Sequence, residues 1–167
     1  VRSGQPLPEA LDAAGVYMPH LCYHPNLGSI QTCDTCFVHV DGNLVRGCGV
    51  TVKPGMEIGL HNETARDARM EGINRVTANH ELYCSLCDNN NGNCDVHNTV
   101  RDMEVPGQAY EFRGKPYEKD YSNPFYIYDP DQCILCGRCV EACQNLQVNE
   151  TLSIDWSRER PRVIWDE

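Results

Sequence analysis

The 167-residue sequence has few of the large apolar residues that build an extended core, with 3 Phe, 2 Trp and 4 Met. No apolar run approaches the roughly 18 residues needed to span a bilayer, so an integral membrane protein is not expected. Positive charge is also scarce: the formal net charge is -10, which argues against nucleic acid or an anionic membrane surface as the main partner. There is no glycine-rich phosphate loop and no pattern for nucleophilic or proton-transfer catalysis.

Cysteine, in contrast, is abundant, with 11 residues. The count is odd and the cysteines cluster at C-x2-C spacing, which suits metal binding better than disulfide bridging. A chain of this length forms one or two small domains. We therefore expect these domains to be stabilised by metal as well as by a core.

Residues 133–143 carry four cysteines at the spacing C-x2-C-x2-C-x3-C, the bacterial iron–sulfur pattern. A tight loop lets the first three thiolates converge on one face of a cubane cluster. A helix predicted over residues 138–146 carries the fourth cysteine away, toward a neighbouring cluster. The expected ligands are Cys133, Cys136 and Cys139 for one [4Fe–4S] cluster, and Cys143 for a second one.

No cysteine follows Cys143, so the partner run that would complete both clusters is missing. Two strands are predicted near residues 151–156 and 162–165, around a charged turn. Residues 129–167 thus predict the first half of a two-cluster ferredoxin domain. We expect the sequence, which also lacks an initiator Met, to be a piece of a longer protein.

Residues 1–60 predict a small α+β module. It contains a short helix over residues 8–14 and a hairpin with strands at 37–40 and 44–46. Its cysteines follow the pattern C-x10-C-x2-C-x11-C and are Cys22, Cys33, Cys36 and Cys48. Four thiolates hold a [2Fe–2S] cluster, two per iron. They also form a zinc site, and the residues alone leave both open.

Residues 61–104 predict a helix over 62–80, a second ligand set and a short helix over 96–103. The set is His80, Cys84, Cys87 and Cys94, with an Asn-rich return at 89–93 before the last cysteine. If the helix continues, its first three members fall on one face. One histidine with three cysteines fits a [4Fe–4S] cluster or zinc. His97 competes with His80 as the fourth ligand.

Residues 105–128 contain no cysteine and form a predicted linker. Aromatic residues gather there: Tyr110, Phe112, Tyr117, Tyr121, Phe125, Tyr126 and Tyr128. They either shield clusters from water, which tunes a cluster's potential, or anchor an irregular segment on its neighbours. The second interpretation is favoured.

The order of the three motifs resembles the N-terminal electron-transfer region of three groups of enzymes. These are the large subunit of respiratory complex I, iron-only hydrogenases, and cytosolic molybdenum- or tungsten-dependent formate dehydrogenases. Cys143 argues against the complex I form, whose third motif lacks it. The amino-acid sequence around these motifs, at residues 31–36 (QTCDTC) and 131–144 (DQCILCGRCVEACQ), looks most like that of the formate dehydrogenase large (alpha) subunit.

The resemblance implies an α+β fold built of a ferredoxin-like [2Fe–2S] domain truncated at its start, a small helical [4Fe–4S] domain and half of a two-cluster ferredoxin domain. It implies a relay of electrons between a molybdopterin formate/CO2 site outside this segment and a partner subunit linked to NAD or quinone. A hetero-oligomeric complex in the reducing cytoplasm is expected. The alternatives are the same relay in a hydrogenase or complex I-like enzyme, and a zinc-stabilised interaction module.

Overall fold

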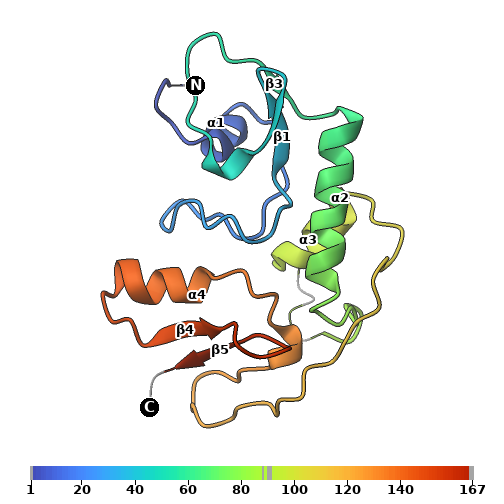
Figure 1. Cartoon of the computed structure of the whole chain (residues 1–167), viewed down its shortest axis with the longest axis vertical. Coiled ribbons are helices and arrows are strands. Elements are labelled where there is room, and N and C mark those ends of the chain that lie inside the picture. The colour runs from blue at the N-terminus through green and yellow to red at the C-terminus, as the bar shows by residue number, and fades with distance from the viewer. Residues whose placement is uncertain (1, 88, 90–91, 166–167) are drawn as a thin grey trace.

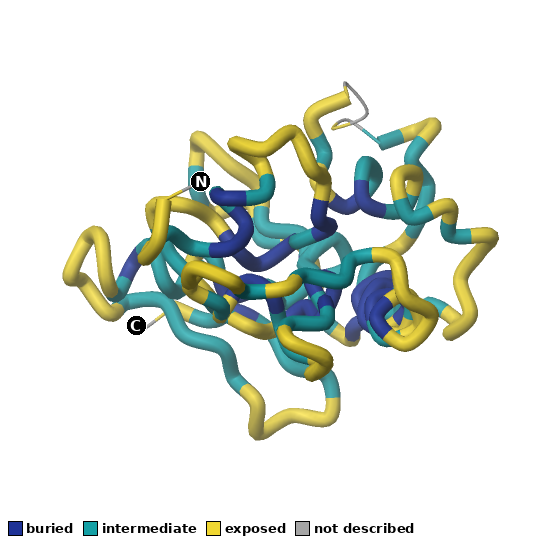
Figure 2. The backbone as a smooth tube through the Cα atoms, turned by 90° about the horizontal axis from the view of Figure 1, so that it is seen from above, coloured by how far each residue is buried: buried dark blue, intermediate teal, exposed yellow. Residues whose placement is uncertain are grey.

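The computed structural model describes residues 2–87, 89 and 92–165. Figure 1 shows three parts along the long axis: an N-terminal part with a small sheet, a central part with the longest helix, and a C-terminal part with a hairpin. Figure 2 shows the buried backbone in the interior, with exposed loops around it. The mixture of helices and strands confirms the predicted α+β class.

The N-terminal part is a short helix packed on a three-stranded antiparallel sheet. Helix α1 spans Leu7–Ala13, strands β1, β2 and β3 span Phe37–Val40, Asn43–Arg46 and Ile58–Gly59, and the 3-10 turn η1 spans Gly47–Gly49. The strand order is β2-β1-β3, with Val38 opposite Val45 in the central pair. The helix and the hairpin lie where the sequence predicts them, within one residue.

The β1–β2 turn shows why the hairpin forms. Asp41 and Gly42 both have positive φ values, 49° and 83°. A two-residue turn of this kind matches the twist of the flanking strands, and Asp-Gly adopts it at low cost. The resulting sheet places Val38, which is fully buried, against Leu7 of α1.

The central part contains helices α2 (Glu63–Thr77) and α3 (Asp95–Asp102). Helix α2 packs against the N-terminal part at Gly72, where a Cβ atom would lie only 2.6 Å from the backbone oxygen of Asp34. Only glycine allows this approach. Arg69, one turn earlier on α2, donates to the carbonyls of Phe37 and Leu60, both at 2.8 Å.

Helix α2 ends three residues earlier than predicted. The chain beyond Thr77 runs through turns, so the predicted common helical face for His80, Cys84 and Cys87 is wrong. The reason lies in the linker, which supplies donors to the carbonyls at the helix end. Gln108 donates to the carbonyl of Thr77 (2.7 Å), and Lys115 donates from Nζ to the carbonyl of Asn79 (2.8 Å). Such side chains satisfy carbonyls that a longer helix would otherwise have used.

The C-terminal part begins with the 3-10 turn η2 (Pro130–Gln132). Helix α4 (Arg138–Glu141) continues into the π-helix η3 (Ala142–Leu146), and β4 (Leu152–Asp155) pairs antiparallel with β5 (Arg162–Trp165). These elements agree with the predicted helix and strand pair, except that the second half of the helix is π-helical. Within the described residues, no helix combines the length and apolar character required to cross a membrane.

Candidate metal centres

The four cysteines of the N-terminal part lie where two hydrophobic cores meet. Cys36 and Cys48 belong to the core of the sheet, whereas Cys22 and Cys33 belong to the core beneath α2. All four are buried, and Cys22 and Cys36 are only 1% exposed. The structure thus brings together the full quartet expected for the first site.

The thiols of this quartet contact one another. A hydrogen bond with Cys22, followed by burial, raises the pKa of Cys33 far above its ordinary value. A hydrogen bond with Cys22 lowers the pKa of Cys48, but a hydrogen bond with Cys36 and burial outweigh it and raise that pKa to about 11. The raised pKa values favour neutral thiols at Cys33 and Cys48, and a cationic iron centre would convert such thiols into thiolate ligands.

Hydroxyl groups surround the same sulfur atoms. Ser29 donates from Oγ to Sγ of Cys48 at 3.2 Å, and Thr35 Oγ1 hydrogen-bonds with Sγ of Cys33 at 3.1 Å. Donors of this kind stabilise negative charge on sulfur. The donor set therefore fits a thiolate-bound metal group.

The loop that carries Cys33 and Cys36 is fixed by Asp34, one of the two residues between them. Asp34 has a φ of 59° and accepts hydrogen bonds from Arg46 and from Arg75 of α2, the latter at 2.6 Å. Although burial alone would raise the pKa of Asp34, these two guanidinium groups lower it. The charged contacts hold the C-x2-C loop against both β2 and α2.

The second ligand set lines one cavity of about 170 Å³. The predicted ligands on its wall are His80, Cys84, Cys87 and Cys94. His97 lies on the same wall, as do Gln132 and Ile134 from the C-terminal part. The three cysteines are only half-buried. The predicted Asn-rich return at 89–93 lies partly outside the described residues.

The hydrogen bonding of the two histidines distinguishes them. The ring of His80 is held by a hydrogen bond from Nδ1 to the carbonyl of Gln132, at 3.1 Å. Because a carbonyl only accepts, Nδ1 carries the proton and Nε2 keeps a lone pair, as in most metal-binding histidines. Burial also lowers the pKa of His80 and favours the neutral ring. For His97, it is the backbone N–H and not the ring that donates to Sγ of Cys94, at 3.5 Å, as part of the cap of α3.

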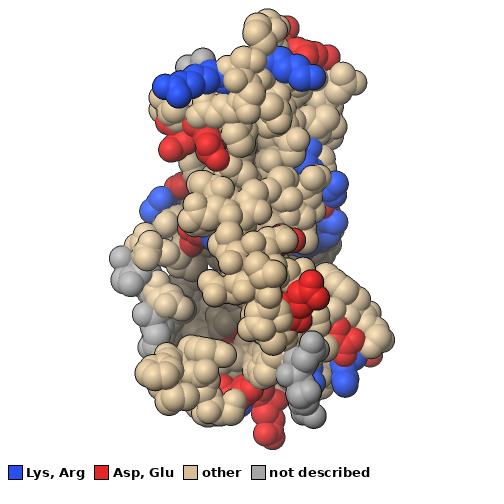
Figure 3. All heavy atoms as spheres, turned by 90° about the vertical axis from the view of Figure 1, so that its left-hand side faces the viewer, with Lys and Arg blue, Asp and Glu red and all other residues tan. Residues whose placement is uncertain are grey.

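The third set lies on the segment that leads into α4: Cys133 and Cys136 precede the helix, and Cys139 is its second residue. Cys133 and Cys139 line a larger cavity of about 880 Å³, together with Cys87, linker residues such as Tyr126 and Tyr128, and Trp165 of β5. Figure 3 views the side of the molecule where α4 and the hairpin lie and shows a hollow in its lower half, with charges of both signs scattered around it. Burial raises the pKa of Cys136, whereas Cys139 is exposed.

Cys143, the fourth cysteine of this run, lies on the element after α4. It is buried on the π-helix η3, and its Sγ is 3.3 Å from Oγ1 of Thr151. Like Cys136, it does not line the cavity that Cys133 and Cys139 line. None of the eleven cysteines, all of which lie in the described part of the chain, forms a disulfide. Among the described residues, no three His, Cys, Asp or Glu side chains close around the position of a single ion.

Residues 132–138, from the last residue of η2 to the first residue of α4, contact both other sites. On one side Thr32 donates from Oγ1 to the carbonyl of Cys136 (2.9 Å), and Arg138 donates to the carbonyl of Tyr23 (2.9 Å), next to Cys22. On the other side lies the hydrogen bond from His80 to Gln132. We call this segment the junction loop. It brings the three ligand sets into one contiguous arrangement.

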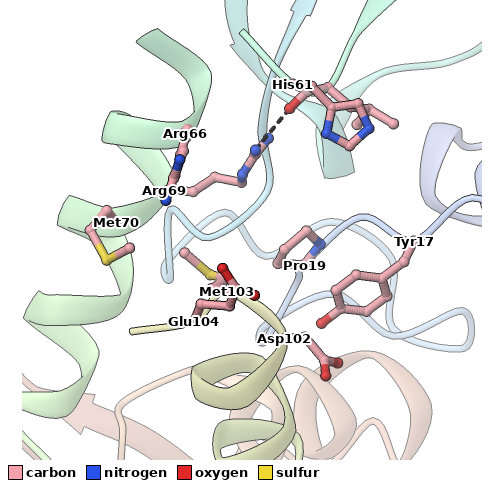
Figure 4. Close-up of a pocket in the computed structure, with 10 residues that line it drawn as sticks. Tyr17, Pro19, His61, Arg66, Arg69, Met70, Asp102, Met103 and Glu104 are labelled. Carbon is pink, nitrogen blue, oxygen red and sulfur yellow. Dashed lines mark hydrogen bonds between the residues drawn. The ribbon is translucent and has the colours of Figure 1, made fainter. Parts of the chain in front are cut away.

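A further cavity of about 300 Å³ lies between α2, α3 and the segment after β3 (Figure 4). It is lined by Arg66, Arg69, Asp102 and Glu104 among others, and contains no cysteine. Figure 4 shows the guanidinium of Arg69 directed at a backbone carbonyl. Arg69 thus ties α2 to the sheet at Phe37 and to the segment after β3 at Leu60.

Several residues that build the sites escaped the sequence analysis. Gly72 had a signal: glycine inside a helix costs about 1 kcal/mol relative to alanine, which indicates a packing reason. Lys115 and Thr32 had none, because their partners lie far away in the sequence. Their roles depend on tertiary contacts.

Three family models match successive parts of the chain. Residues 1–63 match a 2Fe-2S iron-sulfur cluster binding domain. Residues 69–109 match the NADH-ubiquinone oxidoreductase-G iron-sulfur binding region, and residues 126–146 match a 4Fe-4S binding domain. The chain therefore contains binding domains for both types of cluster.

Longer relatives match nearly the whole chain. A probable oxidoreductase of Bacillus subtilis is 54% identical over 95% of this chain and 16% of its own length. A putative formate dehydrogenase of Staphylococcus haemolyticus is 50% identical over 99% of this chain and 17% of its own length. The chain thus spans about a sixth of the length of these relatives.

A solved structure shows the same fold. It is the crystal structure of an NAD+-reducing [NiFe]-hydrogenase in the H2-reduced state, 28% identical with a TM-score of 0.86, covering 100% of this chain and 70% of that one. Taken together, these matches define a chain with 2Fe-2S and 4Fe-4S binding domains that is similar to one part of longer proteins named as oxidoreductases. Within that class the chain is similar to proteins named formate dehydrogenase, which confirms the predicted resemblance.

Proposed function

We propose that this chain relays single electrons through three ligand sets that meet at the junction loop. The first set binds a [2Fe–2S] cluster through Cys22, Cys33, Cys36 and Cys48. The second binds a [4Fe–4S] cluster through His80, Cys84, Cys87 and Cys94. The third supplies Cys133, Cys136 and Cys139 to a [4Fe–4S] cluster and Cys143 to a further one. Bound clusters would supply one-electron chemistry; the protein positions and insulates them.

The observation that carries this proposal is the pair of contacts made by the junction loop. It hydrogen-bonds to the first site through Thr32 and to the second through His80. Both peripheral sites thus adjoin the third one. The arrangement supports a branched relay, in which electrons from either peripheral site pass through the Cys133–Cys139 site.

The domain limits proposed for this relay are residues 1–60, 61–104 and 129–167, with 105–128 as a linker. Tyr110 and Tyr117 in the linker donate from their hydroxyls to Glu71 (2.7 Å) and to the carbonyl of Arg160 (2.6 Å). Phe125, in contrast, is 92% exposed. These contacts support the anchoring interpretation of the aromatic segment.

For the whole protein we propose a formate dehydrogenase. Formate oxidation at a molybdopterin site holding molybdenum or tungsten would take place outside this chain, and a partner subunit linked to NAD or quinone would exchange electrons with it. A cytoplasmic hetero-oligomer is proposed, because such clusters are assembled in a reducing compartment. Support comes from the relatives named formate dehydrogenase.

The test uses the full-length protein purified without oxygen. It should contain iron and acid-labile sulfide, give EPR signals of both cluster types on reduction, and reduce a viologen dye with formate. Stoichiometric zinc without sulfide would contradict the relay and favour a zinc-stabilised interaction module.

The second candidate is the same relay in a hydrogenase or complex I-like enzyme, which the hydrogenase likeness favours. Dye reduction with hydrogen or NADH, but not with formate, would select it.

A further inference from the structure

Lys115 is a buried lysine at the contact between the second and third sites. It is only 7% exposed, although lysine is rarely buried without a partner. Its Nζ donates to three backbone carbonyls: Asn79 at 2.8 Å, Pro130 at 2.6 Å and Cys133 at 3.2 Å. The three hydrogen atoms of the ammonium group are therefore all used.

No carboxylate forms an ion pair with this ammonium group within the described part of the chain. Carbonyl dipoles hold the ammonium group. Burial lowers the pKa of Lys115, and Cys133, Asp131 and Asp129 oppose this shift without forming an ion pair with Nζ. A buried charge without an anionic partner is costly. Loaded iron–sulfur sites with thiolate ligands carry net negative charge, and the proposed ligands of two such sites flank Lys115.

The three carbonyls belong to the segments that carry these ligands. Asn79 directly precedes His80, and Cys133 is itself a proposed ligand. The hydrogen bond from His80 to Gln132 lies between the same two segments. The backbone N–H of Lys115 also donates to Oδ1 of Asp131 at 2.7 Å, which fixes the lysine on η2. One side chain thus joins the end of α2 to the junction loop.

We propose that Lys115 is a positioning residue for electron transfer between the His80 site and the Cys133 site. Its ammonium group holds the two ligand-bearing segments together, and its charge raises the reduction potentials of both clusters. This inference rests on the proposed function. The physical reason is that reduction adds negative charge, which a nearby positive charge stabilises, most strongly where water is excluded.

The test is an EPR-monitored redox titration of the full-length protein carrying Lys115→Met. Methionine has a comparable length and no charge. We expect both [4Fe–4S] potentials to shift downward and the [2Fe–2S] potential to shift less, with iron content retained. Lys53→Met, which removes an exposed charge in the N-terminal part, is the matched control and should leave all potentials unchanged.

Lys115→Gln and Lys115→Arg complete the test. Glutamine keeps hydrogen-bond donors without charge and should reproduce the downward shift, whereas arginine keeps the charge and should restore most of the wild-type potential. If Lys115→Met fails to bind clusters, the glutamine variant decides. A glutamine or methionine variant with wild-type potentials would overturn the proposal. Wild-type protein without iron and sulfide would instead overturn the proposed function.

Discussion

The first and second ligand sets differ in how they are supported. Cys22, Cys33, Cys36 and Cys48 are buried in two cores and contact one another. The second set lies on turns around an open cavity, and its cysteines are half-buried. The first site is therefore part of the core of its domain, whereas the second lies at its surface, with His80 tied to the C-terminal part by its hydrogen bond to Gln132.

The largest expected effect is on folding. Cys36→Ser should abolish the [2Fe–2S] EPR signal and lower the Tm by roughly 10 °C or more, because the metal group completes the core around it. Cys87→Ser is the matched variant at the second site. It should remove one [4Fe–4S] signal and leave the Tm nearly unchanged. Equal losses of Tm in the two variants would contradict the difference between the sites.

The next prediction concerns the histidine of the second site. His80→Cys should retain the cluster and lower its reduction potential, because a thiolate adds negative charge where imidazole is neutral. His97→Ala should leave the EPR spectrum and the potential of that cluster unchanged. A spectrum altered by the His97 substitution alone would assign the ligand to His97.

A smaller effect is expected at the contact between α2 and the C-x2-C loop. Gly72→Ala should lower the free energy of unfolding by about 1–3 kcal/mol, because the new methyl group meets the backbone of Asp34. Asp67→Ala, at an exposed position of the same helix, is the control and should have little effect. Urea unfolding measures both. A stabilised Gly72→Ala variant would show that the approach of α2 to the loop is not tight.

The smallest effect is electrostatic. Asp34→Asn should destabilise the protein by about 1 kcal/mol at pH 7, since both arginine partners are partly exposed and screened by solvent. The pKa of Asp34 is lowered in the folded state, so its contribution is complete above its ordinary pKa and is lost as pH falls through the folded-state pKa. The difference in the free energy of unfolding between the variant and the wild type should shrink as the pH falls from about 5 to about 3. A difference independent of pH would exclude the charge as its cause.

Local features of the fold were predictable because their causes are local. Asp41-Gly42 specifies a hairpin turn, and the cysteine spacing indicates cluster-binding loops. The end of α2 was not predictable, because Gln108, about thirty residues downstream, supplies the donor to the carbonyl of Thr77. The choice between His80 and His97 likewise depends on the distant carbonyl of Gln132, which no spacing rule includes.

The junction loop also bears on how such proteins diversify. Its contact with the N-terminal part, through Thr32, is separate from its contact with the central part, through His80. Loss or replacement of either neighbour would leave the other hydrogen bond in place. One peripheral module can therefore be replaced by another in evolution while the seven residues of the junction loop, 132–138, stay the same.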